Sequence, residues 1–337
     1  MQQIKNTITL LTLLFSTINL LAQHEGIIAH DPAIAQENDK YYLFTTGWGI
    51  DMWQSDNMVS WERAGHVFNQ PPEWTKETVE GFKGHMWAPD IVFHNNQYFL
   101  YYSISAFGKN TSAIGVATNQ TLDPQNENYQ WIDHGMLIQS IPNQTNWNAI
   151  DPAVAFDKKN KPYMFFGSFW DGLKRVKLTD ELLEIDEDIN KIQTVASRKK
   201  SSKEPNPPAI EDNPRDAGGN AIEAPFVFKK GKYYYLFASI DYCCKGPRSS
   251  YKIIVARSKK IKGKFTDDNG KDMAINGGKL VLQGNENWHG VGHNAVASFN
   301  GNDYLIFHGY DANDDGKPKL IIRQIQWTND LWPSVQL

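Results

Sequence analysis

Cysteine is nearly absent from this sequence of 337 residues. Cys243 and Cys244 are the only two, and because they are adjacent they cannot cross-link distant parts of a fold. The chain therefore does not rely on a framework of disulfides for its stability. We expect a pair of small packing thiols. A strained disulfide between the two neighbours is the alternative in an oxidising compartment.

An excess of positive charge is also missing. The chain has 34 Lys and Arg against 38 Asp and Glu, which gives a formal net charge of −4. The one basic cluster, between Arg198 and Lys203, runs into a segment rich in Pro and acidic residues and is typical of a solvated loop. Recognition of nucleic acid requires a basic face, so we expect no nucleic-acid partner.

Long apolar runs are confined to the N-terminus. Lys5 precedes an apolar stretch from Ile8 to Leu21, and Ala22 is a small residue of the kind that precedes a cleavage point. A membrane anchor is the alternative, but Thr, Ser and Asn interrupt the stretch, which is short for a bilayer span. We predict a signal peptide over residues 1–22 and a mature protein without a membrane span, secreted or periplasmic.

Aromatic residues, in contrast, are abundant. They make up 12% of the chain, with 11 Trp, 14 Tyr and 17 Phe, although apolar residues reach only 41%. Most of these rings must belong to a core, but a surplus of flat side chains also suits the apolar faces of sugar rings. No long amphipathic helix pattern accompanies them, which favours an all-β protein.

One sequence pattern recurs five times. A short apolar strand, a turn with Asn, Gly, Asp or Lys, and a second strand dense in Tyr and Phe form each copy. The copies begin at Asp31, Ala88, Asp151, Glu223 and His293. Further strand candidates between them cover residues 114–118, 174–178, 252–257 and 320–326.

Each interval is long enough for four strands, and five such sheets arranged radially form a β-propeller around a central channel. A β-sandwich would not explain five similar hairpins at near-constant intervals. We therefore predict an all-β, five-bladed propeller with four-stranded blades as a single domain over residues 23–337. The stretch 197–219, rich in Pro, Ser and charge, is interpreted as an insertion within it.

Three of the five copies begin with a carboxylate: Asp31, Asp151 and Glu223. If the copies are blades, these residues share one place on the innermost strands and converge at the mouth of the channel. A single Asp before Pro is common in a turn at a strand end. Three like charges aimed at one axis are costly, since burial and repulsion both oppose ionisation, so their recurrence indicates catalysis. Glycoside cleavage uses such a set, with one carboxyl protonated and another ionised.

Several segments, in the same order, give this pattern a specific resemblance. The chain resembles glycoside hydrolase family 43, and within it the arabinan endo-1,5-α-L-arabinosidases, over essentially its whole length after residue 22. The segments that carry the resemblance are HDPAI at 30–34, HMWAPDI at 85–91, YYSISAFGKNTSAIGVATN at 101–119, NAIDPAV at 148–154, GSFWDG at 167–172, NAIEAPFVF at 220–228, DYCCKG at 241–246 and GVGHNAV at 290–296.

The resemblance implies an inverting hydrolase of α-1,5-L-arabinan. It assigns Asp31 as the general base that activates water, Glu223 as the general acid, and Asp151 as the residue that orients Glu223 and raises its pKa. Inversion needs roughly 6.5–9.5 Å between acid and base so that water fits. By the same resemblance His293 contacts a largely water-ligated calcium ion near the acids, although a lone His is more often a hydrogen-bonded structural residue.

The matched segments also contain candidates for substrate binding. Trp87, Phe107 and Trp170 lie where loops leave the channel mouth and are candidates for stacking on sugars, with ordinary core aromatics as the alternative. His30, Asn148 and Ser168 are polar neighbours expected to bond arabinose hydroxyls. One departure is FHGYD at 307–311, where the resembled enzymes carry a bulkier residue in place of Gly309. This departure leaves the shape of the cleft open. It therefore also leaves open whether the enzyme cuts within the chain or from its ends.

Other functions remain in competition at this point. A β-xylosidase or α-L-arabinofuranosidase of the same family would keep the three acids and change the cleft walls. A fructan-processing propeller would retain configuration, and its expected motifs differ from AIDPAV and IEAPFV. A non-catalytic glycan-binding propeller would keep aromatic platforms but lose an acid, whereas all three acids are present here. The sequence is silent on oligomeric state.

Overall fold

The computed structural model describes residues 27–198 and 219–337. The predicted signal peptide, 1–22, lies outside the described residues, as does most of the predicted insertion at 197–219. Within the described ranges the regular structure is almost entirely β, with one short helix, α1 (Trp74–Thr78), and three single 3-10 turns. None of the helical segments in these ranges has the length and apolar character that crossing a bilayer demands.

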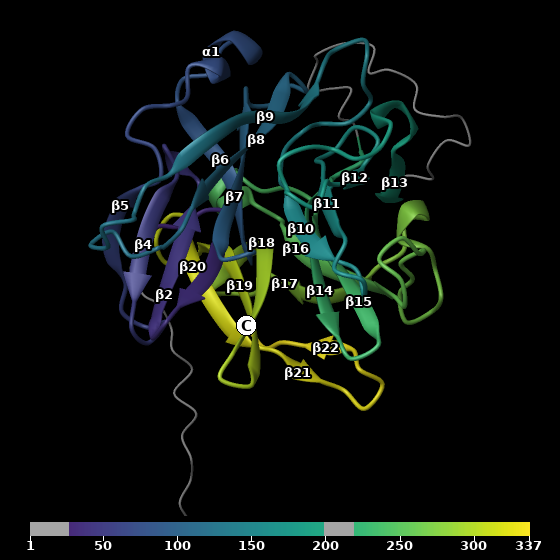
Figure 1. Ribbon diagram of the computed structural model, residues 1–337. Coiled ribbons are helices and arrows are strands. Elements are labelled where there is room, and N and C mark those ends of the chain that lie inside the picture. The colour runs from purple at the N-terminus through teal and green to yellow at the C-terminus, as the bar shows by residue number, and fades with distance from the viewer. Residues whose placement is uncertain (1–26, 199–218) are drawn as a thin grey trace, which may run out of the picture.

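Five antiparallel sheets form the blades of a propeller (Figure 1). The first three blades follow one another along the chain. Blade 1 contains β1 (Ala33–Glu37), β2 (Lys40–Thr45), β4 (Asp51–Ser55) and β5 (Glu62–His66). Blade 2 contains β3 (Gly47–Trp48), β6 (His85–His94), β7 (Gln97–Ser105), β8 (Ser112–Asn119) and β9 (Ile132–Ser140). Blade 3 contains β10 (Ala153–Phe156), β11 (Pro162–Phe166), β12 (Leu173–Lys177) and β13 (Gln193–Ala196).

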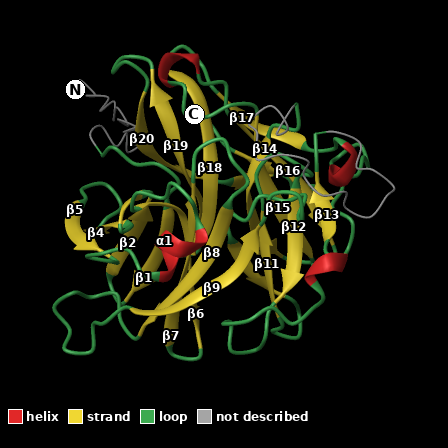
Figure 2. Cartoon of the chain, turned by 90° about the horizontal axis from the view of Figure 1, so that it is seen from above, coloured by secondary structure: helices red, strands yellow, loops and turns green. Residues whose placement is uncertain are grey.

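Two further blades and a small hairpin complete the fold. Blade 4 contains β14 (Ile222–Lys230), β15 (Tyr233–Ile240), β16 (Lys252–Ser258) and β17 (Lys279–Gln283). Blade 5 contains β18 (Trp288–Phe299), β19 (Asn302–Asp311) and β20 (Lys317–Gln324). The hairpin of β21 (Gln326–Trp327) and β22 (Pro333–Ser334) follows. Figure 2 shows the sheets succeeding one another around the molecule, from β2 through β6, β11 and β14 to β18.

The predicted five-bladed propeller is therefore confirmed, and the four additional strand candidates overlap with β8, β12, β16 and β20. Blade 5 has only three strands of its own, and the start of the chain supplies the missing edge. Ile28 pairs with Lys319 of β20, the Ala29 N–H donates to Pro318 O at 3.3 Å, and the Leu320 N–H donates to Ile27 O at 3.2 Å. The N-terminal segment thus links blade 1 to blade 5 and closes the ring.

The core consists of five apolar layers, each between two neighbouring blades. In β2, Tyr42 and Phe44 face blade 2 while Tyr41 and Leu43 face blade 5. Successive side chains of a strand point to opposite faces, and here both faces are buried. This explains why the second strand of every repeat is a continuous aromatic and apolar run instead of an alternating one.

Candidate active site

A residue in the left-handed backbone conformation lies within, or two residues before, each innermost strand. The five residues are Asp31 (φ 53°), Ala88 (φ 46°), Asp151 (φ 58°), Ala224 (φ 53°) and His293 (φ 51°). Such values are uncommon outside glycine and concentrate at functional sites. In blade 4 the equivalent position is Ala224, so the prediction that Glu223 shares the position of Asp31 and Asp151 is wrong by one residue. Glu223 reaches the site from the preceding position, beside an irregularity in the β14–β15 register.

Polar side chains connect these five positions around the channel. In four cases the backbone N–H donates to a side chain near the end of the second strand of the preceding blade. The pairs are Asp31 with His308 Nδ1 (3.1 Å), Ala88 with Thr46 Oγ1 (2.9 Å), Asp151 with Ser103 Oγ (3.0 Å) and His293 with Ser239 Oγ (2.8 Å). The fifth case, the N–H of Ala224, differs. Continuing the β10–β11 register of the preceding blade, blade 3, gives Gly167 at the equivalent position, and glycine has no side chain to accept this N–H. There the Ala224 N–H donates to Asp151 Oδ2 at 3.0 Å instead.

Asp31 is surrounded by donors. Its Oδ1 lies 2.9 Å from His30 Nδ1 and 3.0 Å from His293 Nδ1, and its Oδ2 accepts a hydrogen bond from Thr46 Oγ1 at 2.6 Å. Burial opposes ionisation, but the interactions with His293 and His30 outweigh it and hold the pKa of Asp31 well below its usual range. This carboxyl is therefore ionised at neutral pH.

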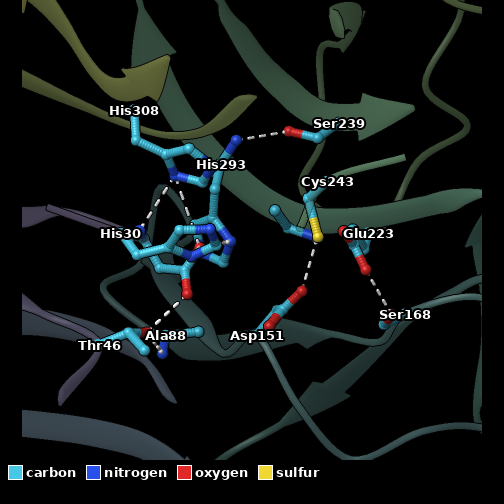
Figure 3. Close-up of polar contacts among 12 residues, drawn as sticks. His30, Thr46, Ala88, Asp151, Ser168, Glu223, Ser239, Cys243, His293 and His308 are labelled. Atoms are coloured by element: carbon cyan, nitrogen blue, oxygen red, sulfur yellow. Dashed lines mark hydrogen bonds and ion pairs between the residues drawn. The ribbon is translucent and has the colours of Figure 1, made fainter. Parts of the chain in front are cut away.

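Two histidines near Asp31 differ in charge. Burial alone would lower the pKa of His293, but Asp31 and Asp151 raise it to about 9, so this partly buried imidazole is a cation. Burial lowers the pKa of His308 well below its usual value. His308 is consequently neutral, in agreement with its Nδ1 accepting the Asp31 N–H. Figure 3 shows His30, His293 and His308 gathered on one side of the site, with Asp151 and Glu223 on the other.

Two hydroxyl groups hold the Glu223 carboxyl. Ser168 Oγ donates to Oε2 and Tyr251 Oη donates to Oε1, both at 2.6 Å. Tyr251 is fully buried, and Gly292 makes room for it, because a Cβ at Gly292 would lie 2.1 Å from the tyrosine ring. The sequence does not predict Tyr251, since Tyr occurs in every blade and nothing local in the sequence distinguishes this one.

The third carboxyl, Asp151, couples to the other two. Burial raises the pKa of Asp151, the charges of Glu223 and Asp31 add to the rise, and His293 opposes it. The Ala224 N–H bond ties Asp151 to the residue directly after Glu223. All three acids are at most 8% exposed. The three side chains predicted from separate repeats therefore form one buried cluster.

The other predicted residues are distributed around this cluster. Phe107, in the loop between β7 and β8, is 77% exposed, and Trp87 is half-buried with its indole N–H donating to His85 Nδ1 at 3.0 Å. Trp170 follows β11, is half-buried, and accepts a hydrogen bond on its carbonyl from Asn220 Nδ2. Asn148 is buried, and its Oδ1 accepts from Ser112 Oγ at 2.6 Å.

Two expectations need correction. Gly309 lies on β19 within the packed interior, where a Cβ would be 2.6 Å from Ile321 Cδ1 and 2.8 Å from Trp288 Cε3. Its small size therefore serves packing and says nothing about the shape of the cleft. Cys243 and Cys244 are joined by a disulfide bond and are not the packing thiols that we expected.

Comparison with known proteins identifies the family. The model of glycosyl hydrolases family 43 matches residues 27–333. The chain belongs to glycosyl hydrolase family 43. It is 44% identical to an extracellular exo-α-(1→5)-L-arabinofuranosidase of Cellvibrio japonicus over 306 residues, 91% of this chain and 86% of the relative. It is 37% identical to an extracellular endo-α-(1→5)-L-arabinanase of Bacillus subtilis over 311 residues, 91% of this chain and 87% of the relative.

Solved structures give the same result. The α-L-arabinanase of Cellvibrio cellulosa in complex with arabinohexaose superposes with a TM-score of 0.86 at 42% identity, covering 92% of this chain and 96% of that one. An exo-1,5-α-L-arabinanase from a bovine ruminal metagenomic library superposes with a TM-score of 0.84 at 45% identity, covering 92% and 97%. This family 43 chain is therefore a glycoside hydrolase with the fold of these enzymes.

The Tyr251 hydroxyl provides a first test. Tyr251→Phe removes one donor from Glu223 without changing the ring. If Glu223 takes part in catalysis, loss of one hydrogen bond should lower kcat about tenfold with KM within about twofold. Tyr234→Phe is the matched control, because Tyr234 is buried and its hydroxyl has no hydrogen-bond partner among the described residues. Steady-state kinetics and thermal unfolding of both variants make the comparison. Equal kcat in the two variants would remove Tyr251 from this role.

Proposed function

We propose that the protein hydrolyses α-1,5-L-arabinofuranosidic bonds of arabinan with inversion of configuration, cutting within the chain. The observation that carries the proposal is one buried cluster of three carboxyls in which Asp31 is held ionised while ionisation of Asp151 is opposed. An inverting glycosidase requires this combination, an ionised base together with a carboxyl pair that retains a proton. The names of the relatives, which act on 1,5-linked arabinan, supply the substrate.

Asp31 acts as the general base in this proposal. Its low pKa keeps it ready to accept a proton from water, and the donors His30, His293 and Thr46 fix the orientation of the carboxylate. A base of low pKa is weak, but it is ionised throughout the neutral range. Water bound between Asp31 and the anomeric carbon attacks as the leaving oxygen departs on the opposite face.

Glu223 acts as the general acid. It donates its proton to the leaving oxygen, and the hydroxyls of Ser168 and Tyr251 then stabilise the carboxylate that remains. Asp151 positions Glu223 through the Ala224 N–H. Burial and the charge of Glu223 raise the pKa of Asp151, so that Asp151 holds a proton at neutral pH and adds no full negative charge beside the acid.

The residues around the cluster bind the sugar chain. Trp87, Phe107 and Trp170 offer ring faces to the apolar sides of arabinose units. His30 and Asn148 bond arabinose hydroxyls, and Ser168, whose hydrogen is given to Glu223, accepts a hydrogen bond on its oxygen. The high exposure of Phe107 favours contact with substrate over a place in the core.

Cleavage from chain ends is the second candidate. It is favoured by the two relatives named as exo-acting enzymes, which are 44% and 45% identical to this chain, against 37% for the endo-acting Bacillus enzyme. The catalytic cluster serves both modes, because only contacts farther along the bound chain distinguish an internal bond from a terminal one.

The protein is exported, and it binds a metal ion near the carboxyl cluster. Residues 1–22 direct export, in agreement with the relatives named extracellular. A calcium ion binds at His293. Asp31 engages Nδ1 of His293, so Nε2 is the nitrogen left for an ion, and water would complete the oxygen ligands that calcium prefers. These groups fit a largely hydrated ion, whose positive charge would stabilise the neighbouring carboxylates.

Replacing the acid or the base tests the mechanism. Asp31→Asn and Glu223→Gln each keep the shape of the side chain, and we expect kcat on linear arabinan to fall about 10²- to 10⁴-fold. Calorimetric binding of arabino-oligosaccharides should persist in both variants. With the wild type, proton NMR of the first product should show the β-anomer. Turnover near the wild-type rate in either variant, or an α-anomer as first product, would contradict these roles.

Product size over time tests the mode of cleavage. Internal cuts should convert debranched arabinan into a mixture of oligosaccharides with an early fall in viscosity. End-wise cleavage should instead release a single short product while viscosity falls slowly. Xylan and an aryl arabinofuranoside serve as comparison substrates, and release of xylose or of arabinose alone would contradict internal cleavage of arabinan.

Calcium binding at His293 is tested by titration. Calcium should raise the thermal midpoint of the wild type, and His293→Gln should abolish this stabilisation. Because the pKa of His293 is raised to about 9, the ion competes with a proton, so its affinity should increase as the pH rises toward 9. Equal stabilisation of wild type and variant by calcium would place the ion elsewhere.

A further inference from the structure

The disulfide lies next to the proposed general base although it comes from a different blade. Cys243 and Cys244 belong to the loop between β15 and β16 of blade 4, whereas Asp31 precedes β1 of blade 1. The sulfur of Cys244 lies 3.9 Å from His30 Nε2 and also 3.9 Å from the hydroxyl of Tyr310. Nothing in the mechanism above uses this pair of cysteines or Tyr310.

A chain of hydrogen bonds connects the Cys244 backbone to Asp31. The Cys244 N–H donates to Tyr310 Oη at 2.8 Å, and Tyr310 Oη lies 2.8 Å from His30 Nε2. His30 Nδ1 in turn lies 2.9 Å from Asp31 Oδ1. The path from the disulfide to the base therefore has two intermediates, one phenol and one imidazole.

The direction of each bond follows from the groups at the two ends. His308 Nδ1 accepts the Asp31 N–H, so a neutral His308 carries its hydrogen on Nε2, which lies 3.3 Å from Tyr310 Oη. Tyr310 thus receives the N–H of Cys244 and that of His308, and its own hydrogen is left for His30 Nε2. His30 then carries its hydrogen on Nδ1 and donates it to Asp31.

The disulfide determines where this chain begins. A bond between adjacent cysteines closes a small ring that includes the peptide between them and removes rotation about the backbone there. Cys244 is in the left-handed conformation, φ 63°, which directs its N–H at Tyr310. Reduction would free this segment to leave that strained conformation, and Tyr310 would lose one of its two donors.

The rest of the loop is held by contacts that do not involve sulfur. The Ser250 N–H donates to Tyr242 O at 2.9 Å, and the Lys245 N–H donates to Ser249 Oγ at 3.1 Å. Lys252 Nζ pairs with Asp241 at 2.8 Å. Loss of the disulfide should therefore act locally, on the Cys244 N–H and the groups beyond it, and leave blade 4 folded.

We propose that the Cys243–Cys244 disulfide and Tyr310 are positioning groups that fix the tautomer of His30 and thereby the orientation of Asp31, so that reduction of the disulfide lowers turnover. The effect on turnover rests on the proposed role of Asp31 as the base. Cys244 is exposed, which makes the bond accessible to a reductant in solution. An enzyme of this kind works at full rate in an oxidising environment and more slowly in a reducing one.

Because the sequence has no other cysteine, a reductant acts on this bond alone. Tris(2-carboxyethyl)phosphine converts the S–S bond to two thiols while water supplies oxygen and protons and the phosphine becomes its oxide. Titration of two thiols per chain confirms complete reduction. On linear arabinan we expect kcat to fall about fivefold to tenfold, with KM within about twofold and recovery on reoxidation.

Three variants separate positioning from general damage. The double variant Cys243→Ser with Cys244→Ser should have the kcat of the reduced wild type, and the reductant should not change that kcat. Tyr310→Phe should lower kcat similarly, and reduction should add little, because both changes break the same chain. Tyr242→Phe alters an exposed tyrosine of the same loop whose hydroxyl is bonded to no described residue. This variant should retain the wild-type kcat and the wild-type loss of kcat on reduction.

A second readout does not depend on activity. In protein labelled with ¹⁵N-histidine, the His30 signals, assigned by their loss in His30→Gln, should report hydrogen on Nδ1 in the oxidised form and a change on reduction. An unchanged His30 tautomer together with an unchanged kcat after full reduction would overturn the proposal. Absence of hydrolysis in the oxidised wild type would instead contradict the proposed function, and the tautomer measurement would still decide the positioning role.

Discussion

Three buried carboxyl groups around one positively charged imidazole form the constraint on which the rest of this structure depends. Asp31, Asp151 and Glu223 are each less than a tenth exposed, and His293 is the cation among them. Carboxyls removed from water in this way are stable only if they are paired, hydrogen-bonded or protonated, and the cluster combines all three solutions. Asp31 is paired with histidines, Glu223 is held by hydroxyls, and ionisation of Asp151 is opposed.

The propeller supplies what such a cluster requires, because its innermost strands all begin at one end of the channel. Five left-handed residues at that end bring side chains from separate blades toward one point. For residues other than glycine this conformation costs about 1–2 kcal/mol each, which the surrounding structure must offset. The N–H groups of these residues are bonded across the blade boundaries, so the strained backbone and the closure of the ring support each other.

The five blades and the three acids could be predicted from the sequence, because each position of a fivefold repeat can be aligned with four equivalent positions. The same alignment misplaced Glu223 by one residue. Pro follows Asp31, Asp151 and Ala224, so Ala224 is the residue equivalent to the two aspartates, and Glu223 precedes it. Tyr251, His308 and Tyr310 could not be predicted. They lie on second or third strands or just before them, among many similar aromatic residues, and only the packing of neighbouring blades brings their polar atoms to the acids.

The two sides of the cluster depend on different blades, which explains how one fold can set two carboxyls in opposite ways. The groups that keep Asp31 ionised come from blades 1 and 5, through His30, Thr46 and His293. Those that hold Glu223 come from blades 3 and 4, through Ser168 and Tyr251. Asp151 and His293 interact electrostatically with carboxyls on both sides. A substitution in one pair of blades can therefore change the surroundings of Asp31 without moving Glu223, provided that the charges of Asp151 and His293 are preserved.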